Sequence, residues 1–323
     1  MKKIIILFGI LGFLASCGES DIKETKNIAF LKLGGDLAER NLEASGLSWY
    51  KDNLIILPQF PHKWDSENDG AIYFVTKERI EKYIDGSDQT PIYGEKIKFI
   101  ATGLDSIGKS RGSGYEAITF KKDTVFVSIE SVNNNNATSY LVKGIINFEE
   151  RKIILDSEST FEVKSQTGIY NMGEETILEF GGFIYSIHEA NGEKVNQFPT
   201  VTKLDSDLRE VQKINFPNID YRITDATSVD STGKFYAINY FYPGEFKKLR
   251  PILSEELKDY AIEKILEFQI MDDKIIETDK DPILISDGVS KDGNNWEGIV
   301  RLNDGLLIIT DMFPMTKLIY LKN

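Results

Sequence analysis

The most regular feature of the sequence is a repeated pair of short apolar runs with a polar residue at each end. Each copy has a polar residue, a run rich in Val, Ile, Phe and Tyr, a turn, a second such run and a second polar residue. The two polar ends lie fourteen residues apart in every copy, and the copies span Ser45–Gln59, Glu116–Glu130, Glu175–Glu189, Asp225–Asn239 and Glu297–Asp311. This pattern predicts a β-hairpin in each copy.

The middle of each copy carries residues that favour a tight turn, such as Lys122-Asp123, Gly181-Gly182 and Asn303-Asp304-Gly305. Two further strand-like runs follow most copies, for example Ser139–Asn147 and Lys152–Leu155 after the second copy. Four strands per repeat predict an all-β chain, a β-propeller.

We count five blades, and the alternative is a sixth, degenerate blade within residues 60–110. The last copy lacks a strand, which the N-terminal run Asn27–Leu33 would supply, closing the last blade. Short helices are expected at Glu78–Tyr83 and at Leu253–Lys264. Residues 27–323 are predicted to form this single domain.

The repeat also predicts a site, because the start of one antiparallel strand and the end of the next meet on one face. The first strand positions are Ser45, Glu116, Glu175, Asp225 and Glu297, and the second are Gln59, Glu130, Glu189, Asn239 and Asp311. The first copy departs from the pattern, since Ser45 stands where the others have an acid. Glu43 is two residues earlier and would reach the ring through a bulge, so both Glu43 and Ser45 remain candidates.

Many carboxylates in one place raise one another's pKa, and a divalent cation would offset that cost. Oxygen ligands favour Ca²⁺ or Mg²⁺ over Zn²⁺, and we expect Ca²⁺. The predicted metal ligands are Glu43, Glu116, Glu130, Glu175, Glu189, Asp225, Asn239, Glu297 and Asp311. The alternative is that these acids accept backbone hydrogen bonds or pair with neighbouring cations.

Further residues are predicted to contact a ligand at this mouth: Gln59, Lys109, Arg111, His188, Arg222 and Trp296. Cations at the rim would suit an anionic ligand such as a phosphate ester, although they would equally serve to neutralise the acids. The predicted catalytic residues are Glu116 and Glu175, either of which would take a proton from a water bound to the metal. His188 beside Glu189 is the one candidate for a serine-type triad on this face, and a hydrogen-bonded role is preferred for it.

The N-terminus predicts the location of the protein. Residues 1–16 have the basic, apolar and small-residue order of a signal peptide, and Leu14–Cys17 matches a bacterial lipobox. Cys17 is the single cysteine of the chain, so we expect it to carry lipid, with residues 17–26 forming the acylated cysteine and a polar tether. The alternative is an ordinary signal peptide with an incidental cysteine. The predicted location is the bacterial cell envelope, on the outer membrane, facing the periplasm or the surface.

The net charge is −13, and removal of Lys2 and Lys3 with the signal peptide makes it more negative. Nucleic acid is therefore not an expected partner. The expected partners are the lipid bilayer, through Cys17, and a small anionic or ester ligand; the propeller itself is expected to be a monomer.

Several of these motifs together resemble the bacterial propellers known for the "esterase-like activity of phytase", which are related to calcium-dependent propeller lactonases and phytases. The matching stretches are Glu43–Trp49, Gly114–Ile118, Asn171–Glu175, His188–Asn191, Tyr221–Thr227 and Asn295–Val300. The resemblance implies a propeller and a calcium-dependent hydrolase of a phosphoester, ester or lactone. The chain lacks the dense run of Lys and Arg expected of a phytate site. A non-catalytic binding propeller with a structural metal is the second hypothesis.

Overall fold

The chain folds into antiparallel β-sheets whose strands largely follow one another in sequence, as the repeated hairpins predict. The computed structural model describes residues 28–66, 69–109, 113–133, 136–253, 255–291, 293–312 and 315–322. The predicted signal peptide, Cys17 and the tether lie outside the described residues. We divide the strands into five units, one for each hairpin copy.

The first two units share one sheet. Unit 1 contains β3 (Ala44–Tyr50), β4 (Asn53–Pro58), β5 (Ala71–Thr76) and β7 (Glu95–Ile100), and unit 2 contains β8 (Gly114–Lys121), β9 (Thr124–Asn133), β10 (Asn136–Asn147) and β11 (Lys152–Lys164). Each unit is antiparallel, and a short parallel pairing of β7 with β11 joins them. Residues 60–110, the region considered for a sixth blade, thus supply β5 and β7 to unit 1.

The next two units have sheets of their own. Unit 3 contains β12 (Thr176–Phe180), β13 (Phe183–Ile187), β14 (Thr200–Leu204) and β15 (Glu210–Asn215). Unit 4 contains β16 (Arg222–Ala226), β17 (Lys234–Phe241) and β18 (Ala261–Ile270), and both β19 (Ile275–Glu277) and β20 (Ile283–Ser290) pair with β18. The outer strand of unit 4 is therefore interrupted.

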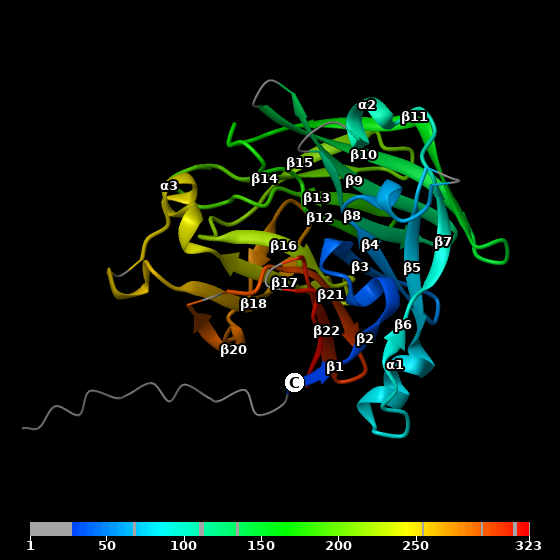
Figure 1. Cartoon of the computed structure of the whole chain (residues 1–323). Helices are drawn as coiled ribbons and strands as arrows, with labels where there is room; N and C mark the ends of the chain where they lie inside the picture. The colour runs from blue at the N-terminus through cyan, green and yellow to red at the C-terminus, as the bar shows by residue number, and fades with distance from the viewer. Residues whose placement is uncertain are drawn as a thin grey trace, which may run out of the picture.

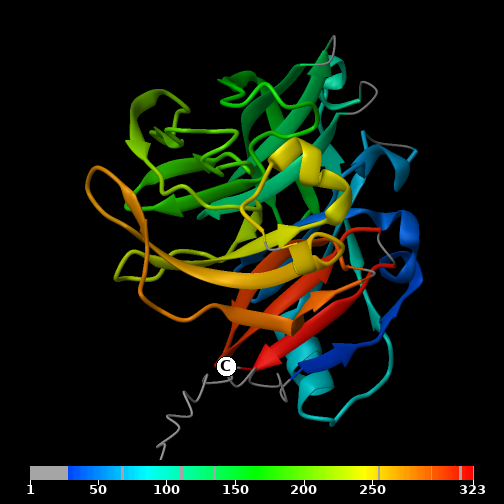
Figure 2. The same ribbon diagram turned by 90° about the vertical axis from the view of Figure 1, so that its left-hand side faces the viewer.

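Unit 5 joins the two ends of the described chain. It contains β21 (Trp296–Leu302), β22 (Gly305–Thr310) and β23 (Leu318–Lys322), with β1 (Ile28–Leu31) paired antiparallel to β23. Figure 2 shows β1 in blue beside the red C-terminal strand. The predicted closing role of the N-terminal run is confirmed by this pairing. Two short strands, β2 (Leu33–Gly34) and β6 (Ile92–Tyr93), pair with each other.

The hairpin turns contain residues with positive φ, among them two lysines. Lys51, Lys122, Gly181 and Asn303 all have positive φ at the turn between the two strands of a copy. Glycine and asparagine adopt this region readily, and it matches the twist of a tight hairpin.

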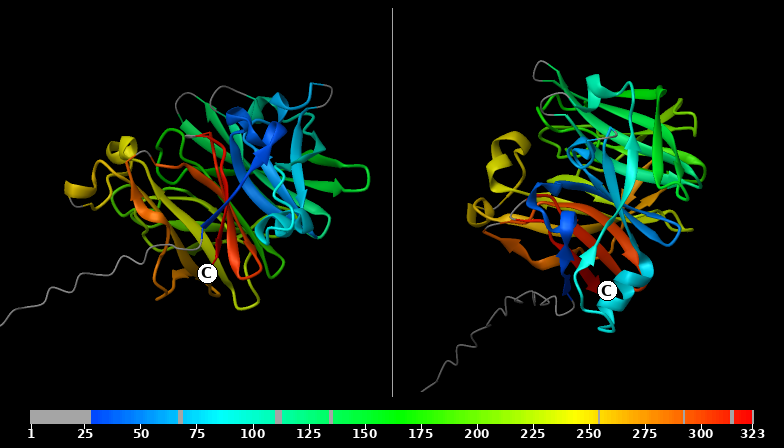
Figure 3. Two further views of the ribbon diagram at one scale, coloured as in Figure 1. Left: turned by 60° about the horizontal axis from the view of Figure 1, so that its bottom comes forward. Right: turned by 45° about the vertical axis from the view of Figure 1, so that its right-hand side comes forward.

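Helices are short and lie outside the sheets. α1 (Lys77–Ile84) contains the helix predicted at Glu78–Tyr83 and is seen in cyan in Figure 3. α2 (Asp105–Gly108), α3 (Phe246–Leu249), and the 3-10 turns η1 (Gly35–Ala38), η2 (Arg40–Leu42), η3 (Pro61–Lys63), η4 (Pro243–Glu245) and η5 (Glu255–Leu257) complete the elements. The helix predicted at Leu253–Lys264 is wrong: only η5 forms there, and β18 begins at Ala261, where its apolar residues pack into the sheet.

The first strands of the five units contact one another in a cycle. β3 contacts β8 and β21, β12 contacts β8 and β16, and β16 contacts β21. Figure 1 shows these strands around the middle of the molecule, with the outer strands at the periphery. This radial arrangement is a β-propeller. Apolar clusters fill the spaces between neighbouring units, as where Phe126 and Leu141 of unit 2 pack with Ile184 of unit 3.

We find no helix in the described part of the chain that is both long and apolar enough to cross a membrane.

Candidate functional site

A cavity of about 210 Å³ opens on the propeller axis, at the end of the first strands where the polar positions were predicted to meet. It is lined by Glu43, Ser45, Gln59, Glu116, Glu130, Glu175, Arg222, Glu297 and Asp311, which the sequence predicted, and by Ala44, Asn171, Asn295 and Met312, which it did not. Six of the predicted carboxylates therefore lie around one cavity.

β-Bulges at the starts of the first strands position several of these side chains. The pairing of β3 with β4 shifts register between Ala44 and Gly46, that of β8 with β9 between Tyr115 and Ala117, and that of β21 with β22 between Trp296 and Gly298. Ser45, Glu116 and Glu297 are the residues within these shifts. A bulge re-aims its side chain away from the regular alternation, which explains why these positions face the axis.

The first unit uses both of its candidate residues. Glu43 has a left-handed backbone, with φ 48°, and its carboxylate pairs with Lys63 Nζ at 3.1 Å. The Ser45 hydroxyl donates to the backbone oxygen of Tyr115 at 2.6 Å and so ties unit 1 to unit 2. The carboxylate from unit 1 is thus that of Glu43, while Ser45 links strands.

Arg222 lies inside the carboxylate cluster rather than at its rim. Its Nη2 donates to both oxygens of Glu175, at 2.8 and 3.0 Å, and its Nε donates to Glu189. Nη2 is also 3.5 Å from Glu297 Oε1, and Nη1 is 3.8 Å from Glu245 Oε1. The predicted rim position is corrected, because Arg222 is the first residue of β16 and its side chain is 11% exposed.

Glu116 and Glu130 also line the cavity, and neither carboxyl group forms an ion pair with a described residue. Gln59 Nε2 donates to Glu116 Oε1 at 3.1 Å, and burial raises the pKa of Glu116 to about 7. The Glu130 residue is 4% exposed, and its carboxyl group has no hydrogen-bond or ion-pair partner among the described residues. Burial, followed by the charges of Glu116 and Glu189, raises the Glu130 pKa to about 9. At neutral pH Glu130 is therefore a carboxylic acid, and Glu116 is poised between its two forms.

Three of the predicted metal ligands bind the protein instead of facing the cavity. Glu189 accepts from the Gly173 N–H at 3.0 Å as well as from Arg222. Asp225 accepts the Ile299 N–H at 2.9 Å, which ties β16 to β21. Asn239 donates to the backbone oxygens of Asp220 and Arg222, at 3.0 and 3.2 Å.

Several predicted ligand contacts also lie elsewhere. Lys109 pairs with Asp105 at 2.8 Å and is not part of the cavity lining. Trp296 is 1% exposed in an apolar cluster with Ile238 and Ile308, and packing accounts for its position. His188 is fully buried, its Nδ1 accepts from the Ala190 N–H, and burial lowers its pKa to about 4. Arg111 lies outside the described residues.

Sequence reasoning missed the partly buried carboxylate of Glu245 and the buried carboxylate of Glu174. Glu245 belongs to η4, in the insertion after β17, and no repeat position marks it. Glu174 directly precedes Glu175, is 1% exposed and accepts the Ser186 hydroxyl at 2.6 Å. The Glu174-Glu175 doublet is the sequence signal that would have drawn attention to it.

These contacts test whether the nine predicted ligands fit one Ca²⁺ ion. Glu175, Glu189 and Glu297 share Arg222, and Asp225 and Asn239 bind the backbone, so the full set does not fit a single ion. Among the described residues no group of three or more His, Cys, Asp or Glu side chains has an arrangement suited to a metal. Calcium binding by Glu43, Glu116, Glu130 and Asp311, the four left over, stays a prediction.

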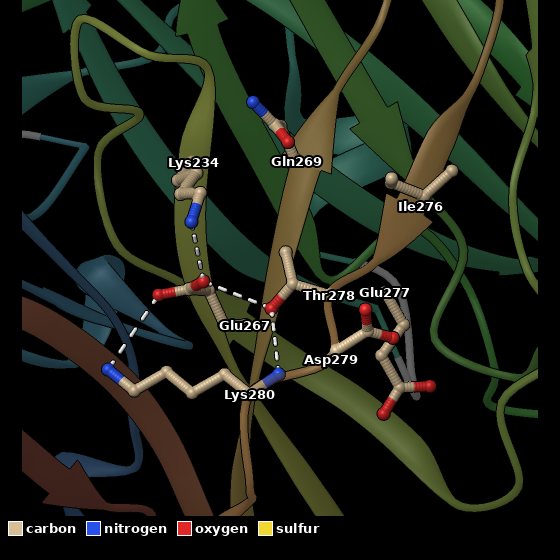
Figure 4. A pocket seen from close by; sticks show the side chains of 8 residues that line it. All are labelled: Lys234, Glu267, Gln269, Ile276, Glu277, Thr278, Asp279 and Lys280. Atoms are coloured by element: carbon tan, nitrogen blue, oxygen red, sulfur yellow. Dashed lines mark hydrogen bonds and ion pairs between the residues drawn. The ribbon is translucent and has the colours of Figure 1, made fainter.

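A wider hollow of about 610 Å³ lies on the outer part of unit 4, where β19 gives way to β20. Figure 4 shows that its two lysines both point to one carboxylate. Lys234 Nζ is 3.2 Å from Glu267 Oε1, Lys280 Nζ is 3.7 Å from Glu267 Oε2, and the Thr278 hydroxyl donates to Oε1 at 3.0 Å. Because these charged groups of the hollow are already paired with one another, we regard the axial cavity as the stronger candidate for a functional site.

No family model and no curated protein matches the sequence. Similar solved structures include a glucose dehydrogenase, at 9% identity over 92% of this chain and 99% of that chain, with a TM-score of 0.45. A glycosyl hydrolase from Bacteroides ovatus shares 8% identity over 93% and 96%, with a TM-score of 0.46. An α-L-arabinanase from Cellvibrio cellulosa shares 11% identity over 86% and 90%, with a TM-score of 0.45. Because these TM-scores lie below 0.5, we base the fold on the strand pairing and the function on the cavity.

Proposed function

We propose that this chain is a five-bladed propeller, held in the bacterial cell envelope through acylated Cys17, whose axial cavity hydrolyses an ester or a lactone. The five strand units are its blades, and β1 closes the last of them. The observation that carries the proposed activity is Glu116, a buried carboxyl group that lines the cavity, has no ion pair among the described residues and has a pKa of about 7.

Glu116 has the properties of a general base. A base is most effective when its pKa lies near the working pH, because it is then both available and strong enough to take a proton. In the proposed step Glu116 takes a proton from a water molecule, and the resulting hydroxide attacks the carbonyl carbon. The tetrahedral intermediate then breaks its bond to the alkoxide oxygen, which takes the proton from Glu116 and leaves as the alcohol. Glu130, protonated at neutral pH, is the described group best suited to donate a hydrogen bond to the developing oxyanion.

Glu175 is less suited to the basic role predicted for it. Both of its oxygens already accept hydrogen bonds from Arg222 and are therefore less available to take a proton from a water molecule. We therefore assign the base to Glu116 alone.

The charge of the cavity favours an uncharged ester or lactone over a phosphoester. Of the cations at the cavity, Arg222 is shared by four carboxylates and Lys63 pairs with Glu43. Both of these cations are thus already paired with carboxylates, which disfavours a phosphate.

The test is hydrolysis of p-nitrophenyl acetate and δ-valerolactone by the mature chain, with p-nitrophenyl phosphate as the charged comparison, in Ca²⁺ and in chelator. Glu116→Gln should lower kcat by about 10²–10⁴-fold, and kcat/KM of the unmodified protein should rise with pH through about 7. Glu193→Gln, an exposed change in a unit 3 loop, is the control. Equal turnover by Glu116→Gln and the unmodified protein would refute the assignment.

The second candidate is a binding module that uses the same cavity without turnover. The fixed carboxylates of Glu175 and Glu297 favour it, because they are ready-made acceptors for a ligand's hydroxyl or ammonium groups. Ligand-dependent thermal stabilisation with no hydrolysis of any probe would assign the protein to this class.

A further inference from the structure

We propose that the Arg222 guanidinium is the built-in counter-cation of the axial carboxylates, in the place where a metal ion was expected, and that it positions Glu175 and Glu297 to accept hydrogen bonds from a ligand. The counter-cation role stands on contacts alone. The ligand role rests on the cavity being the functional site, as proposed above.

Carboxylates from four separate places in the chain converge on the Arg222 side chain. Glu175 precedes β12, Glu189 follows β13, Glu245 is in η4 and Glu297 is in β21. Each of the three guanidinium nitrogens faces at least one of these carboxylates. Arg222 thus connects units 3, 4 and 5 at the mouth of the axis.

The charge of Arg222 opposes the cost of burying these carboxylates as anions. Buried carboxylates are stable as anions only when they are paired. Burial raises the pKa values of Glu175 and Glu297, and Arg222 opposes that rise in both. A guanidinium keeps its charge at any physiological pH and cannot dissociate from the site. A metal ion would require the same oxygens, so Arg222 and a metal exclude each other at this position.

The contacts of Arg222 also determine which acceptor positions the cavity offers to a ligand. Glu175 and Glu297 line it while they contact Arg222, and a carboxylate has about four acceptor positions. The acceptor positions not used by Arg222 remain for a ligand. The cavity would then present acceptors held by Arg222 in one part, and the carboxyl groups of Glu116 and Glu130, which have no ion pair with a described residue, in another. A neutral ligand with both hydroxyl and carbonyl groups matches this division.

The test compares Ca²⁺ binding by calorimetry in Arg222→Met and in the unmodified protein. Met has a similar length and no charge, so the freed carboxylates should bind Ca²⁺ at least about tenfold more tightly than in the unmodified protein. Equal affinity in both proteins would overturn the proposal. Arg222→Lys, which keeps a charge, should gain less affinity than Arg222→Met.

A rescue experiment separates this role from simple loss of packing. Low millimolar guanidinium chloride should raise the Tm of Arg222→Ala but not that of the unmodified protein, because the ion can occupy the vacated position. Urea at the same concentration has the same shape without the charge and is the control. No difference between guanidinium and urea would overturn the proposal.

If the Arg222 variants do not fold, the Ca²⁺ affinity of Glu175→Gln provides a second test. If Arg222 is the counter-cation, Glu175 is not a metal ligand, and Glu175→Gln should leave the Ca²⁺ affinity of the unmodified protein unchanged. A loss of about tenfold or more would show that Glu175 binds the ion and would refute the inference. None of these readouts requires turnover, so they stand apart from the test of hydrolysis.

Discussion

Glu174 should make the free energy of unfolding depend on pH, because it is buried between units 2 and 3 with one partner for its carboxyl group. Oε2 accepts the Ser186 hydroxyl, and Oε1 has no partner among the described residues. Burial raises the pKa of Glu174 from its ordinary value of 4.5 to about 7. At 1.36 kcal/mol for each pKa unit, this difference corresponds to about 3 kcal/mol of folding free energy.

The sign follows from proton uptake. Between pH 4.5 and 7 the folded protein keeps the Glu174 proton, while the unfolded chain has released it. The folded state therefore binds more protons, and the free energy of unfolding falls as pH rises through this window. Glu174→Gln cannot titrate, so the difference in stability between the unmodified protein and this variant should fall by about 3 kcal/mol from pH 4.5 to above pH 7.

The assay is urea unfolding followed by tryptophan fluorescence at a series of pH values. Any pH-independent cost of the amide cancels when the change in the difference is taken. The exposed Glu193→Gln is the matched control and should give a difference that is flat with pH. A flat difference for Glu174→Gln as well would show that Glu174 is already ionised in the folded protein, and the reasoning from burial would fail.

Two further predictions concern the links between strands. Asp225→Asn should lower the free energy of unfolding by about 2–4 kcal/mol, since it replaces an acceptor of the Ile299 N–H with an amide. Urea unfolding measures this loss. If Ca²⁺ stabilised the unmodified protein but not the variant, Asp225 would be a metal ligand instead. Removal of residues 28–31 should leave β23 as an open edge and lower the Tm. Thermal unfolding with light scattering measures the second change, and an unchanged Tm without association would contradict the closing role of β1.

The hairpins and their turns could be predicted because their signals are local. Alternation of apolar residues and a turn pair such as Gly181-Gly182 act within a few residues, and the strands formed where they were expected. The meeting of the polar ends followed from antiparallel geometry. The helix predicted at Leu253–Lys264 failed because charged residues suggested a surface helix, whereas Ile262 and Ile265 are buried in β18.

The role of Arg222 could not be predicted because it depends on contacts that are distant in sequence. The residue precedes Asp225 by three positions, and this spacing suggested a loop at the rim. β16 instead begins at Arg222 itself, with a register shift between Ile223 and Ala226. Its carboxylate partners come from β21, from beside unit 3 and from an insertion. No local pattern states which of many acids will reach one guanidinium.

Residues at the same repeat position have different roles because their side chains differ in length and in neighbours. Asp225 and Glu116 both occupy the first polar position of their copies. The shorter aspartate binds the backbone N–H of the adjacent strand, while the longer glutamate lines the cavity and accepts from Gln59. At the second position Asn239 binds backbone oxygens, whereas Glu130 lines the cavity without a partner among the described residues. The repeat thus places each of these residues at the same point of its hairpin. One methylene group, or an amide in place of a carboxylate, then determines whether the side chain links neighbouring strands or lines the cavity.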